Sequence, residues 1–286
     1  MNRASSATGW VRNPDGTLGW TWNPITGCLN GCEYCYARKL ANGRLKPLYL
    51  ANPRIAIPEG GLGKTELEQG LIRDSFYPRI WQDRIAEPLL FHKPRGIFTC
   101  DMSDLFGLGI PKDWTEAVLY AIKKSPQHRF YLLTKQPQNL IKWSPFPRNV
   151  WVGATVTDAD SYRWAMAFLS QISARIKFLS IEPFLSQFWL RDWEYQRPLK
   201  ATLDLVIIGQ QTPVKQSTTP KLEWIEEIAK ACNRAGIPYF LKDNLAKMIP
   251  PREPLRTFIS YPETDIAGGV WKLRQEMPLI ETGREG

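Results

Sequence analysis

The sequence predicts an α/β protein whose core is a parallel sheet of about six to seven strands, arranged as a partial (β/α) barrel. Two observations lead to this fold class. Short apolar runs bounded by Gly, Pro or Asn recur along the chain, which is typical of strands covered on both faces. Segments with apolar residues at three- and four-residue spacing lie between these runs, which is typical of helices. An open doubly wound sheet would use the same elements, and the pattern alone leaves both arrangements open.

Seven apolar runs are predicted as strands because they are short, rich in β-branched and aromatic residues, and bounded by turn residues. They are Gly19–Trp22, Ile97–Cys100, Phe130–Thr134, Val150–Val156, Lys177–Ile181, Leu205–Ile208 and Tyr239–Leu241.

Three amphipathic segments between these strands are predicted as helices: Trp114–Lys124, Asp158–Ser173 and Leu222–Ala235. Asp158 suits the N-cap of the second helix, because its side chain can accept a hydrogen bond from the first turn. Gly236 follows the third helix and suits a left-handed C-terminal cap.

The predicted barrel domain covers residues 19–245, between an N-terminal extension (1–18) and a C-terminal extension (246–286). Residues 45–95 form an insertion between the first two strands. This insertion begins rich in Pro and Gly and is expected to become helical around Phe76–Phe91. It is either a lid that faces a substrate or an elaboration of the surface.

Composition limits the function classes. The chain has 286 residues, with 37 Lys and Arg against 28 Asp and Glu, and its formal net charge of +9 permits a nucleic-acid partner without requiring one. No apolar run is long enough to span a membrane, and Met1–Gly9 lacks the apolar centre of a secretory signal, so a cytoplasmic protein is expected. With His92 and His128 as the only histidines, His-rich zinc catalysis is almost excluded.

Three of the five cysteines lie within eight residues, with the spacing C-x3-C-x2-C: Cys28, Cys32 and Cys35. Gly27 and Gly31 loosen the loop that carries them. Three thiolates this close can ligate three irons of a [4Fe–4S] cluster and leave the fourth iron open to a substrate or cofactor. Such an odd, closely spaced set is a poor disulfide framework.

A structural zinc site is the alternative interpretation of this loop. Zinc of that kind normally has four protein ligands, and no His or Cys lies within forty residues on either side of the three cysteines. Cys100, after the second strand, is a possible fourth ligand. Cys232 lies on the apolar face of its helix and is interpreted as a core thiol. The remaining cysteines are too few for a second cluster.

The cysteine spacing, with Tyr34 before the third cysteine, resembles the radical S-adenosylmethionine (radical SAM) superfamily. An ordered series of motifs over roughly residues 19–245 also resembles a phage-related family of radical SAM-like proteins of unassigned function. The series comprises Thr21-Trp22-Asn23-Pro24, Met102-Ser103-Asp104-Leu105-Phe106, Leu132-Leu133-Thr134-Lys135, Val150-Trp151-Val152-Gly153, Leu179-Ser180-Ile181-Glu182-Pro183, Val206-Ile207-Ile208-Gly209, Gly236-Ile237-Pro238 and Phe240-Leu241-Lys242.

The chain departs from that family in two places. Many of its members space the first two cysteines more widely. Where Gly-Gly-Glu-Ser is expected after the sixth strand, this chain has Gly209-Gln210-Gln211-Thr212, so any role of that carboxylate cannot be carried over.

The resemblance implies a radical SAM-like barrel and a radical SAM enzyme with two cofactors, one [4Fe–4S] cluster and SAM. The cluster would be ligated by Cys28, Cys32 and Cys35. The implied reaction cleaves SAM to methionine and a 5′-deoxyadenosyl radical, which then acts on an unidentified substrate. It needs an electron donor of the flavodoxin or ferredoxin type, and a monomer is expected.

The chemistry of parallel α/β barrels gathers at the C-terminal ends of the strands, where five polar residues are candidates for binding the cofactor. By resemblance Asp101, Ser103 and Asp104 would meet the amine of SAM. Lys135 is a candidate for the carboxylate of SAM or for the substrate, and Glu182 for the ribose or the amine. The alternatives are helix caps for the aspartates, a surface lysine and a solvated turn carboxylate.

The substrate is predicted to be a nucleic acid, with a peptide as the other candidate. Basic residues lie beside aromatic ones in Arg38–Lys46, Tyr77–Trp81 and Phe91–Arg95, a combination that suits stacking on an unpaired base while the backbone is held by charge. The alternative function is a non-catalytic nucleic-acid-binding protein stabilised by zinc or by a cluster.

Overall fold

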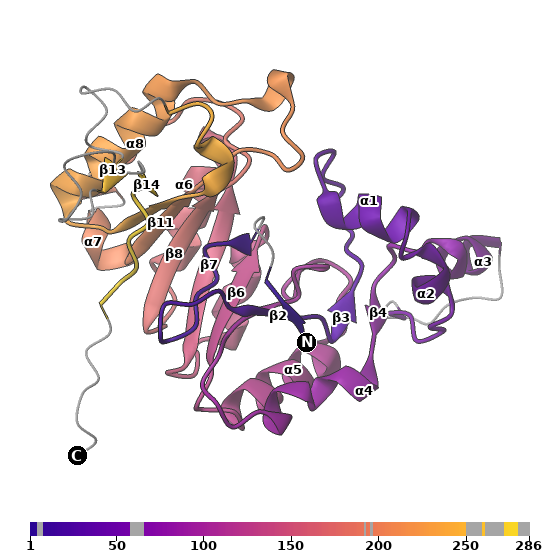
Figure 1. The fold of residues 1–286 in the computed structure, drawn as a ribbon. Helices are drawn as coiled ribbons and strands as arrows, with labels where there is room; N and C mark the ends of the chain where they lie inside the picture. The colour runs from indigo at the N-terminus through magenta and orange to yellow at the C-terminus, as the bar shows by residue number, and fades with distance from the viewer. Residues whose placement is uncertain are drawn as a thin grey trace, which may run out of the picture. The chain divides into compact units, whose positions relative to one another are not determined.

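The computed structural model describes residues 1–4, 8–57, 66–191, 193–194, 197–249, 259–260 and 272–279. It confirms the predicted fold class, because the protein is a mixed α/β structure with a mostly parallel central sheet of eight strands (Figure 1). The chain forms two compact units. The first comprises Met1–Thr155 and Ala167–Arg175, and the second comprises Val156–Met166 and Ile176–Gly286.

In the first unit the strand order is β1-β2-β5-β6-β7. The strands are β1 (Asn2–Arg3), β2 (Trp20–Trp22), β5 (Gly96–Thr99), β6 (Arg129–Thr134) and β7 (Val150–Val156). β1 pairs antiparallel with β2, and the other pairs are parallel. β5 and β7 are buried at every position, as expected for strands covered on both faces.

In the second unit β8 (Ile176–Ile181), β11 (Leu205–Ile208) and β12 (Tyr239–Leu241) are parallel neighbours in chain order. Helix α8 (Leu222–Ala235) ends at Gly236 in the predicted left-handed conformation, with φ of 65°. Residues beyond β12 return along it, because Gln275 forms an antiparallel bridge with Phe240. This return covers hydrogen-bonding groups of β12 that an edge strand would expose. Of the predicted C-terminal extension, residues 250–258, 261–271 and 280–286 lie outside the described residues.

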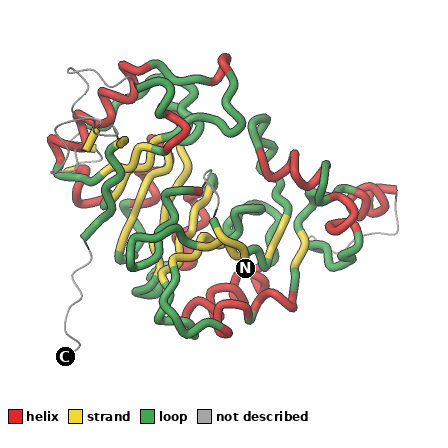
Figure 2. Tube along the Cα trace, in the orientation of Figure 1, coloured by secondary structure: helices red, strands yellow, loops and turns green. Residues whose placement is uncertain are grey.

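The order of the strands distinguishes the two architectures that the sequence left open. A doubly wound sheet reverses its strand order at a switch point. Here the parallel strands of each unit follow one another in chain order, as in a (β/α) barrel. Figure 2 shows the strands in yellow and the helices between them in red. The seven predicted strands are confirmed to within one residue at each end. β1 was not predicted, because two polar residues carry no strand pattern.

The predicted helices are present with shifted ends. They are α5 (Lys112–Lys123), α6 (Ala159–Leu169) and α8. Asp158 caps α6 as predicted, because its Oδ1 accepts a hydrogen bond from the Ser161 N–H at 2.8 Å. The remaining short elements are η3 (Pro137–Trp143), β9 (Trp193–Glu194), β10 (Arg197–Pro198), α7 (Leu199–Thr202), η4 (Gln216–Thr218), η5 (Asp243–Leu245), β13 (Ile259–Ser260) and β14 (Lys272–Leu273). Within the described ranges, no helix is long and apolar enough to cross a membrane.

The insertion is more varied than the predicted single helical stretch. It holds α2 (Lys46–Leu50), α3 (Glu66–Arg73), β4 (Arg79–Ile80), α4 (Gln82–Ile85) and η2 (Glu87–Leu90). The helix expected around 76–91 is therefore only partly confirmed, because its first part forms β4. That strand pairs antiparallel with β3 (Ile25–Thr26), directly before the cysteine loop.

Helices α2 and α3 form a small lobe of the first unit together with α1 (Tyr36–Asn42), which follows the cysteine loop (Figure 1). A separate apolar cluster lies there and includes Ala41, Tyr49, Phe76 and Met102. Arg79 is fully buried, and its guanidinium donates to three backbone carbonyls, those of residues 52, 72 and 74. These hydrogen bonds offset the cost of burying a charge, and they stabilise the interior of the lobe.

The N-terminal extension packs against the sheet at a point of close backbone approach. The Trp10 ring contacts the rings of Phe98 and Tyr131, with centroids 5.1 and 5.4 Å away. A Cβ atom on Gly96, the first residue of β5, would lie 1.9 Å from the Arg12 carbonyl oxygen. Only glycine therefore fits at this position.

We predict that Gly96→Ala lowers the free energy of unfolding by about 1–3 kcal/mol or more, because the added methyl group has no space. Gly70→Ala in α3 is the matched control. Its Cβ would meet nothing within 4 Å, so it should stabilise the helix by about 0.5–1 kcal/mol. Urea unfolding followed by tryptophan fluorescence measures both changes, and equal effects of the two substitutions would contradict the close approach.

Candidate functional site

The cysteine loop is docked on the residues that follow β5. The Gly27 N–H donates to the Met102 carbonyl oxygen at 2.9 Å, and Ser103 Oγ donates to the Gly27 carbonyl oxygen at 2.5 Å. Gly27 has φ of 86°, and a Cβ there would lie 2.4 Å from the Tyr77 carbonyl oxygen. Glycine is thus required where the loop begins.

The backbone of Cys28 is held by the insertion at its N–H and by α1 at its carbonyl oxygen. Its N–H donates to the Phe76 carbonyl oxygen at 3.0 Å, and its carbonyl oxygen accepts from Arg38 Nη2 at 3.1 Å. Its Sγ accepts a hydrogen bond from the Asn30 N–H at 3.4 Å. Burial, with a smaller effect from the Asp104 charge, raises the pKa of the Cys28 thiol to about 12. The thiol is therefore neutral at physiological pH unless a metal displaces its proton.

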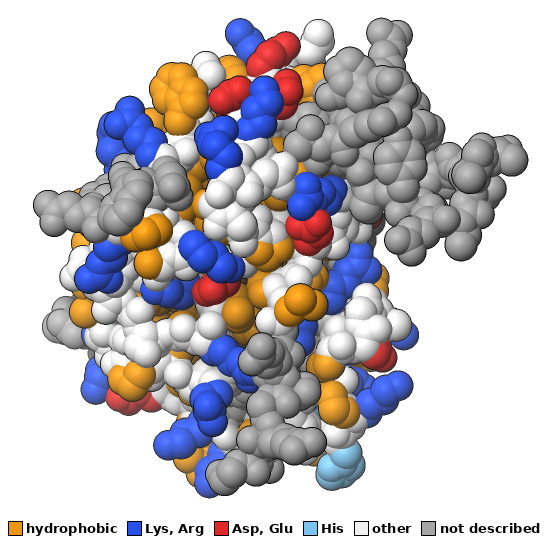
Figure 3. Space-filling model, turned by 90° about the vertical axis from the view of Figure 1, so that its left-hand side faces the viewer, with side chains coloured by type: hydrophobic (Ala, Val, Ile, Leu, Met, Phe, Trp, Pro, Cys, Tyr) orange, Lys and Arg blue, Asp and Glu red, His pale blue; other side chains and the backbone are white. Residues whose placement is uncertain are grey.

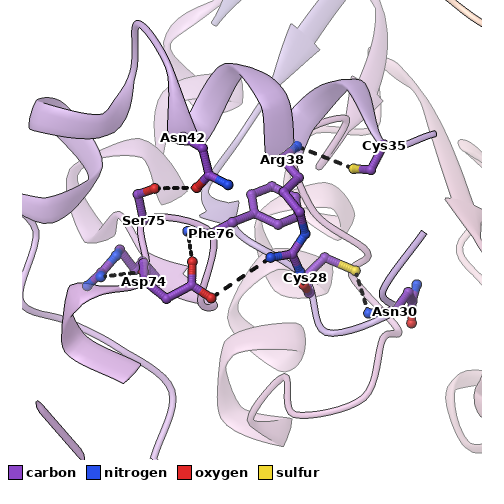
Figure 4. A network of polar contacts seen from close by, with 9 residues as sticks. Cys28, Asn30, Cys35, Arg38, Asn42, Asp74, Ser75 and Phe76 are labelled. Atoms are coloured by element: carbon purple, nitrogen blue, oxygen red, sulfur yellow. Dashed lines mark hydrogen bonds and ion pairs between the residues drawn. The ribbon is translucent and has the colours of Figure 1, made fainter. Parts of the chain in front are cut away.

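Arg38 links the loop to the insertion, as Figure 4 shows. Its guanidinium lies over the Phe76 ring, 4.8 Å from the centroid, and 4.0 Å from Asp74 Oδ2. Ser75 Oγ donates to Asn42 Oδ1 at 2.7 Å in the same network. The ion pair is partly exposed and contributes little by itself. The backbone bonds to Cys28 are the firmer connection.

Cys35 is the N-cap of α1, and its Sγ accepts a hydrogen bond from the Arg38 N–H at 3.3 Å. Cys32 precedes it in the same turn, and Gly31 has φ of 69°. None of the three thiols is bridged, and all three are partly exposed. In the part of the chain that the structure describes, no three His, Cys, Asp or Glu side chains are gathered closely enough to hold a metal ion. Metal binding would therefore require these thiols to turn toward one another.

Cys100 sits at a strained turn at the end of β5. Its φ of 61° is the only positive φ of a non-glycine residue in the described chain, and its side chain is buried. Burial raises the pKa of this thiol as well. The turn directs the next four residues across the cysteine loop, and such strain is common at functional sites.

Asp101 keeps part of its acceptor capacity. Its Oδ1 accepts from Asn23 Nδ2 at 2.6 Å, while the Tyr36 hydroxyl donates to its carbonyl oxygen at 2.7 Å and lies 3.4 Å from Oδ2. Desolvation raises the pKa of Asp101 in spite of these bonds. A carboxylate that is costly to ionise at a strand end is a candidate for binding a cation.

Asp104 is buried, and both of its carboxylate oxygens are occupied. Oδ1 accepts from the Phe106 N–H at 3.2 Å, and Oδ2 accepts from Asn30 Nδ2 and from the Lys135 N–H, each at 2.9 Å. The Lys135 ammonium lies 5.7 Å from the centroid of the Tyr34 ring, beside the third cysteine. The first unit thus brings Asp101, Ser103, Asp104 and Lys135 to the cysteine loop.

Glu182 follows β8 in the second unit, where it forms an ion pair with the buried Lys242. Gly209 makes room for this pair, since a Cβ there would lie 2.8 Å from Lys242 Cδ. Where the family pattern has a carboxylate, this chain has Gln211, whose Oε1 accepts a hydrogen bond from Thr218 Oγ1 at 2.9 Å. The strand ends of the second unit therefore carry their own polar cluster.

Several residues of the site were not predicted from the sequence, namely Asn23, Asn30, Tyr36, Arg38 and Gln136. Asn23 and Asn30 lie beside Pro24 and Gly31, so the sequence shows them as ordinary turn residues. Their contacts are made to side chains more than seventy residues away, and a local pattern gives no signal of this.

The chain belongs to the family described as "Protein of unknown function (DUF5131)", which it matches over residues 16–248. A comparison with curated proteins finds no match. Among solved structures it is similar to two mutants of spore photoproduct lyase, one a Cys-to-Ser and the other a Tyr-to-Phe variant. The identities are 12% and 11%, each with a TM-score of 0.40 and with 92% of this chain and 70% of the other covered.

We predict that Asp101→Asn stabilises the protein at pH 7. The raised pKa of Asp101 means that the folded state binds its proton more tightly, so ionisation reduces stability as pH rises above the unfolded value of 3.8. The amide removes this cost, so the gain should vanish toward pH 3. Thermal unfolding at both pH values measures it. The exposed Asp113→Asn is the control, and a loss of stability at pH 7 would contradict the prediction.

We also predict an order of thiol labelling by iodoacetamide at pH 8 in protein without metal. Cys32 and Cys35 are partly exposed and should react first, while the raised pKa of Cys28 should slow its reaction. Cys100 and Cys232 are buried and should react only after unfolding. Peptide mass spectrometry gives the order, and denatured protein is the control. Early labelling of Cys100 would contradict the described packing.

Proposed function

We propose that this protein is a radical SAM enzyme in which Cys28, Cys32 and Cys35 ligate one [4Fe–4S] cluster. One observation carries the proposal: three unbridged, partly exposed cysteines lie on a single loop at the C-terminal end of β2, with polar residues from the ends of β5 and β6 beside them. Three ligands of this kind leave one iron open to a cofactor.

The chemistry of the donor set fits such a cluster. Backbone N–H groups donate to the sulfurs of Cys28 and Cys35, as is common for thiolates in iron–sulfur proteins. The charges of Cys32 and Cys35 make small contributions to the raised pKa of Cys28, so the three thiols lie within range of one another's charge, although they are not gathered as a metal-binding group in the described residues. When bound, the cluster would supply one electron for the reductive cleavage of SAM.

The residues around the loop bind and orient in this proposal. Asp101 would accept hydrogen bonds from the amine of SAM, because one of its oxygens has a single long contact. Lys135 would meet the carboxylate of SAM or the substrate, beside the Tyr34 ring. Ser103 and Asp104, also expected at the amine, hold the loop in the structure. Glu182, paired with Lys242, is proposed as a ribose ligand.

A flavodoxin- or ferredoxin-like protein would deliver the electron to this enzyme, which would act as a monomer in the cytoplasm.

The alternative function is that of a non-catalytic nucleic-acid-binding protein stabilised by zinc or by a cluster. Structural zinc normally has four protein ligands, whereas the loop supplies three cysteines, and this ligand count favours the enzyme.

A nucleic acid is the proposed substrate class, but two of the three basic segments predicted to contact it serve the fold. Arg79 is buried among carbonyls. Arg95 lies between the rings of Trp20 and Phe91, 3.9 and 3.6 Å from their centroids. On the face shown in Figure 3, basic side chains stand singly or in small groups between uncharged ones. The exposed cations of the third segment are Lys39, Arg44 and Lys46.

Anaerobic reconstitution with iron and sulfide tests the proposed cofactor. We expect about four iron and four sulfide per chain, with protection of the three loop thiols from alkylation. After reduction, SAM should be converted to methionine and 5′-deoxyadenosine. Cys28→Ala, Cys32→Ala and Cys35→Ala should each abolish both results. The buried Cys232→Ala is the matched control and should retain the cluster. One zinc without sulfide would support the alternative.

We further predict that single-stranded DNA binds through Lys39, Arg44 and Lys46. Replacing all three by Ala should reduce the salt dependence of log K by about two, since each contact to a single strand contributes about 0.7. Fluorescence anisotropy between low and physiological salt measures it. Lys123→Ala with Lys124→Ala, both exposed on α5, is the control. A salt-independent affinity in the unmodified protein would favour a peptide substrate.

A further inference from the structure

Asp104 was expected to bind the amine of SAM, but its contacts indicate a different role. We propose that Asp104 is a positioning residue, which acts through Asn30 to fix the segment between Cys28 and Cys32 for cluster binding. We call the pair the Asp104–Asn30 clasp. The inference rests on the proposed function, because its role is to hold two cluster ligands at their spacing.

The carboxylate of Asp104 has little capacity left for a cofactor. It is 5% exposed, and three N–H donors of the protein already occupy most of its roughly four lone-pair sites. These donors come from three places: the Asp104 turn itself, the cysteine loop and the end of β6. A buried carboxylate with this set of partners joins segments that are distant in the sequence.

Asn30 connects Asp104 to the sulfur of Cys28, a proposed cluster ligand. Its side-chain Nδ2 donates to Asp104, while its backbone N–H donates to Cys28 Sγ at 3.4 Å. Its Oδ1 accepts from Gln136 Nε2, and Gln136 Oε1 in turn accepts from Asn139 Nδ2 at 3.1 Å. Asn30 is thus fixed by a donor on one side and an acceptor on the other.

The neighbouring residue Leu29 restricts the same segment sterically. A Cβ on Gly109 would lie 2.6 Å from Leu29 Cδ1, so that glycine leaves room for the leucine. Gly31, at φ of 69°, follows Asn30. Leu29 is partly exposed and lies against Gly109, so between this leucine and the glycine at position 31 the Asn30 side chain sets where the loop turns toward Cys32.

The direction of the hydrogen bond provides a sharp test. Asp104→Asn keeps the shape but leaves one oxygen for three N–H donors, so its NH2 group faces either Asn30 Nδ2 and the Lys135 N–H or, after rotation of the amide, the Phe106 N–H. Asn30→Asp places two carboxylates against each other. In the double variant, N30D/D104N, the amide at 104 donates to the carboxylate at 30, which also still accepts from Gln136. The bond between residues 30 and 104 is then restored with its polarity reversed, while the Lys135 N–H loses its acceptor at residue 104.

The experiment compares the unmodified protein, the two single variants, the double variant and the exposed control Asp113→Asn, each reconstituted anaerobically. Release of iron to a chelator and the electron paramagnetic resonance spectrum of the reduced cluster are measured. Each single variant should release iron about tenfold faster, since a hydrogen bond to a charged group is lost. The double variant should recover part of this loss, because it restores the bond between residues 30 and 104 but not the one from the Lys135 N–H. Asn30→Ala, at a partly exposed position, should match the single variants if either of them fails to fold.

The outcomes separate this inference from the proposed function. If the unmodified protein takes up no iron and sulfide, the proposed function fails and the clasp loses its role with it. If the cluster forms but the single variants release iron at the unmodified rate, the clasp alone is overturned. Asp104 would instead be a cofactor ligand if D104N weakened only the spectral change caused by SAM and Asn30→Asp did not rescue it.

Discussion

The docking of the turn after β5 onto the cysteine loop is the interaction on which the candidate site depends. The two hydrogen bonds between Gly27 and residues 102 and 103 join segments about 75 residues apart. They are possible because Cys100 adopts a left-handed conformation and Gly27 lacks a side chain. The left-handed conformation of Cys100 opposes the intrinsic preference of the backbone, so the rest of the unit must hold this residue in place. β5, buried between β2 and β6, supplies that support.

The insertion also contacts the cysteine loop. The kind of contacts it makes is typical of a fixed part of the structure rather than of a lid that opens. A lid is expected to contact the site through side chains whose contacts break easily when it opens. Here the connection is made by backbone, through the β3–β4 pairing and the bond from the Cys28 N–H to the Phe76 carbonyl oxygen. The buried Arg79 donates hydrogen bonds to the carbonyls of residues 52, 72 and 74 and so joins these parts of the insertion. Opening this wall would expose an apolar cluster and an arginine that has lost its acceptors.

The sequence predicted the sheet well because buried parallel strands are continuous apolar runs whose signal is local. It missed β1 because pairing at an edge needs only backbone groups. In the site, the sequence identified the strand ends and the residue types, but not their partners. The sequence pattern of an aspartate after a strand does not indicate what its oxygens contact. One oxygen of Asp101 is able to face a cofactor, whereas Asp104 contacts a distant asparagine. The sequence likewise predicts Arg79 as a surface cation beside aromatic residues. Its carbonyl partners come from other parts of the insertion, so no local pattern indicates that it is buried.

The electrostatics of the loop explain why two carboxylates can stand beside three cysteines. Burial, with a smaller effect from the Asp104 charge, raises the pKa of the Cys28 thiol, so its thiolate is disfavoured at this place. Without a metal the Cys28 thiol stays protonated, which keeps it a poor nucleophile and slow to oxidise. A bound metal centre would displace this proton, because its positive charge stabilises the thiolate. At Cys28, a place that is unfavourable for a free thiolate is therefore compatible with a thiolate that is bound to a metal.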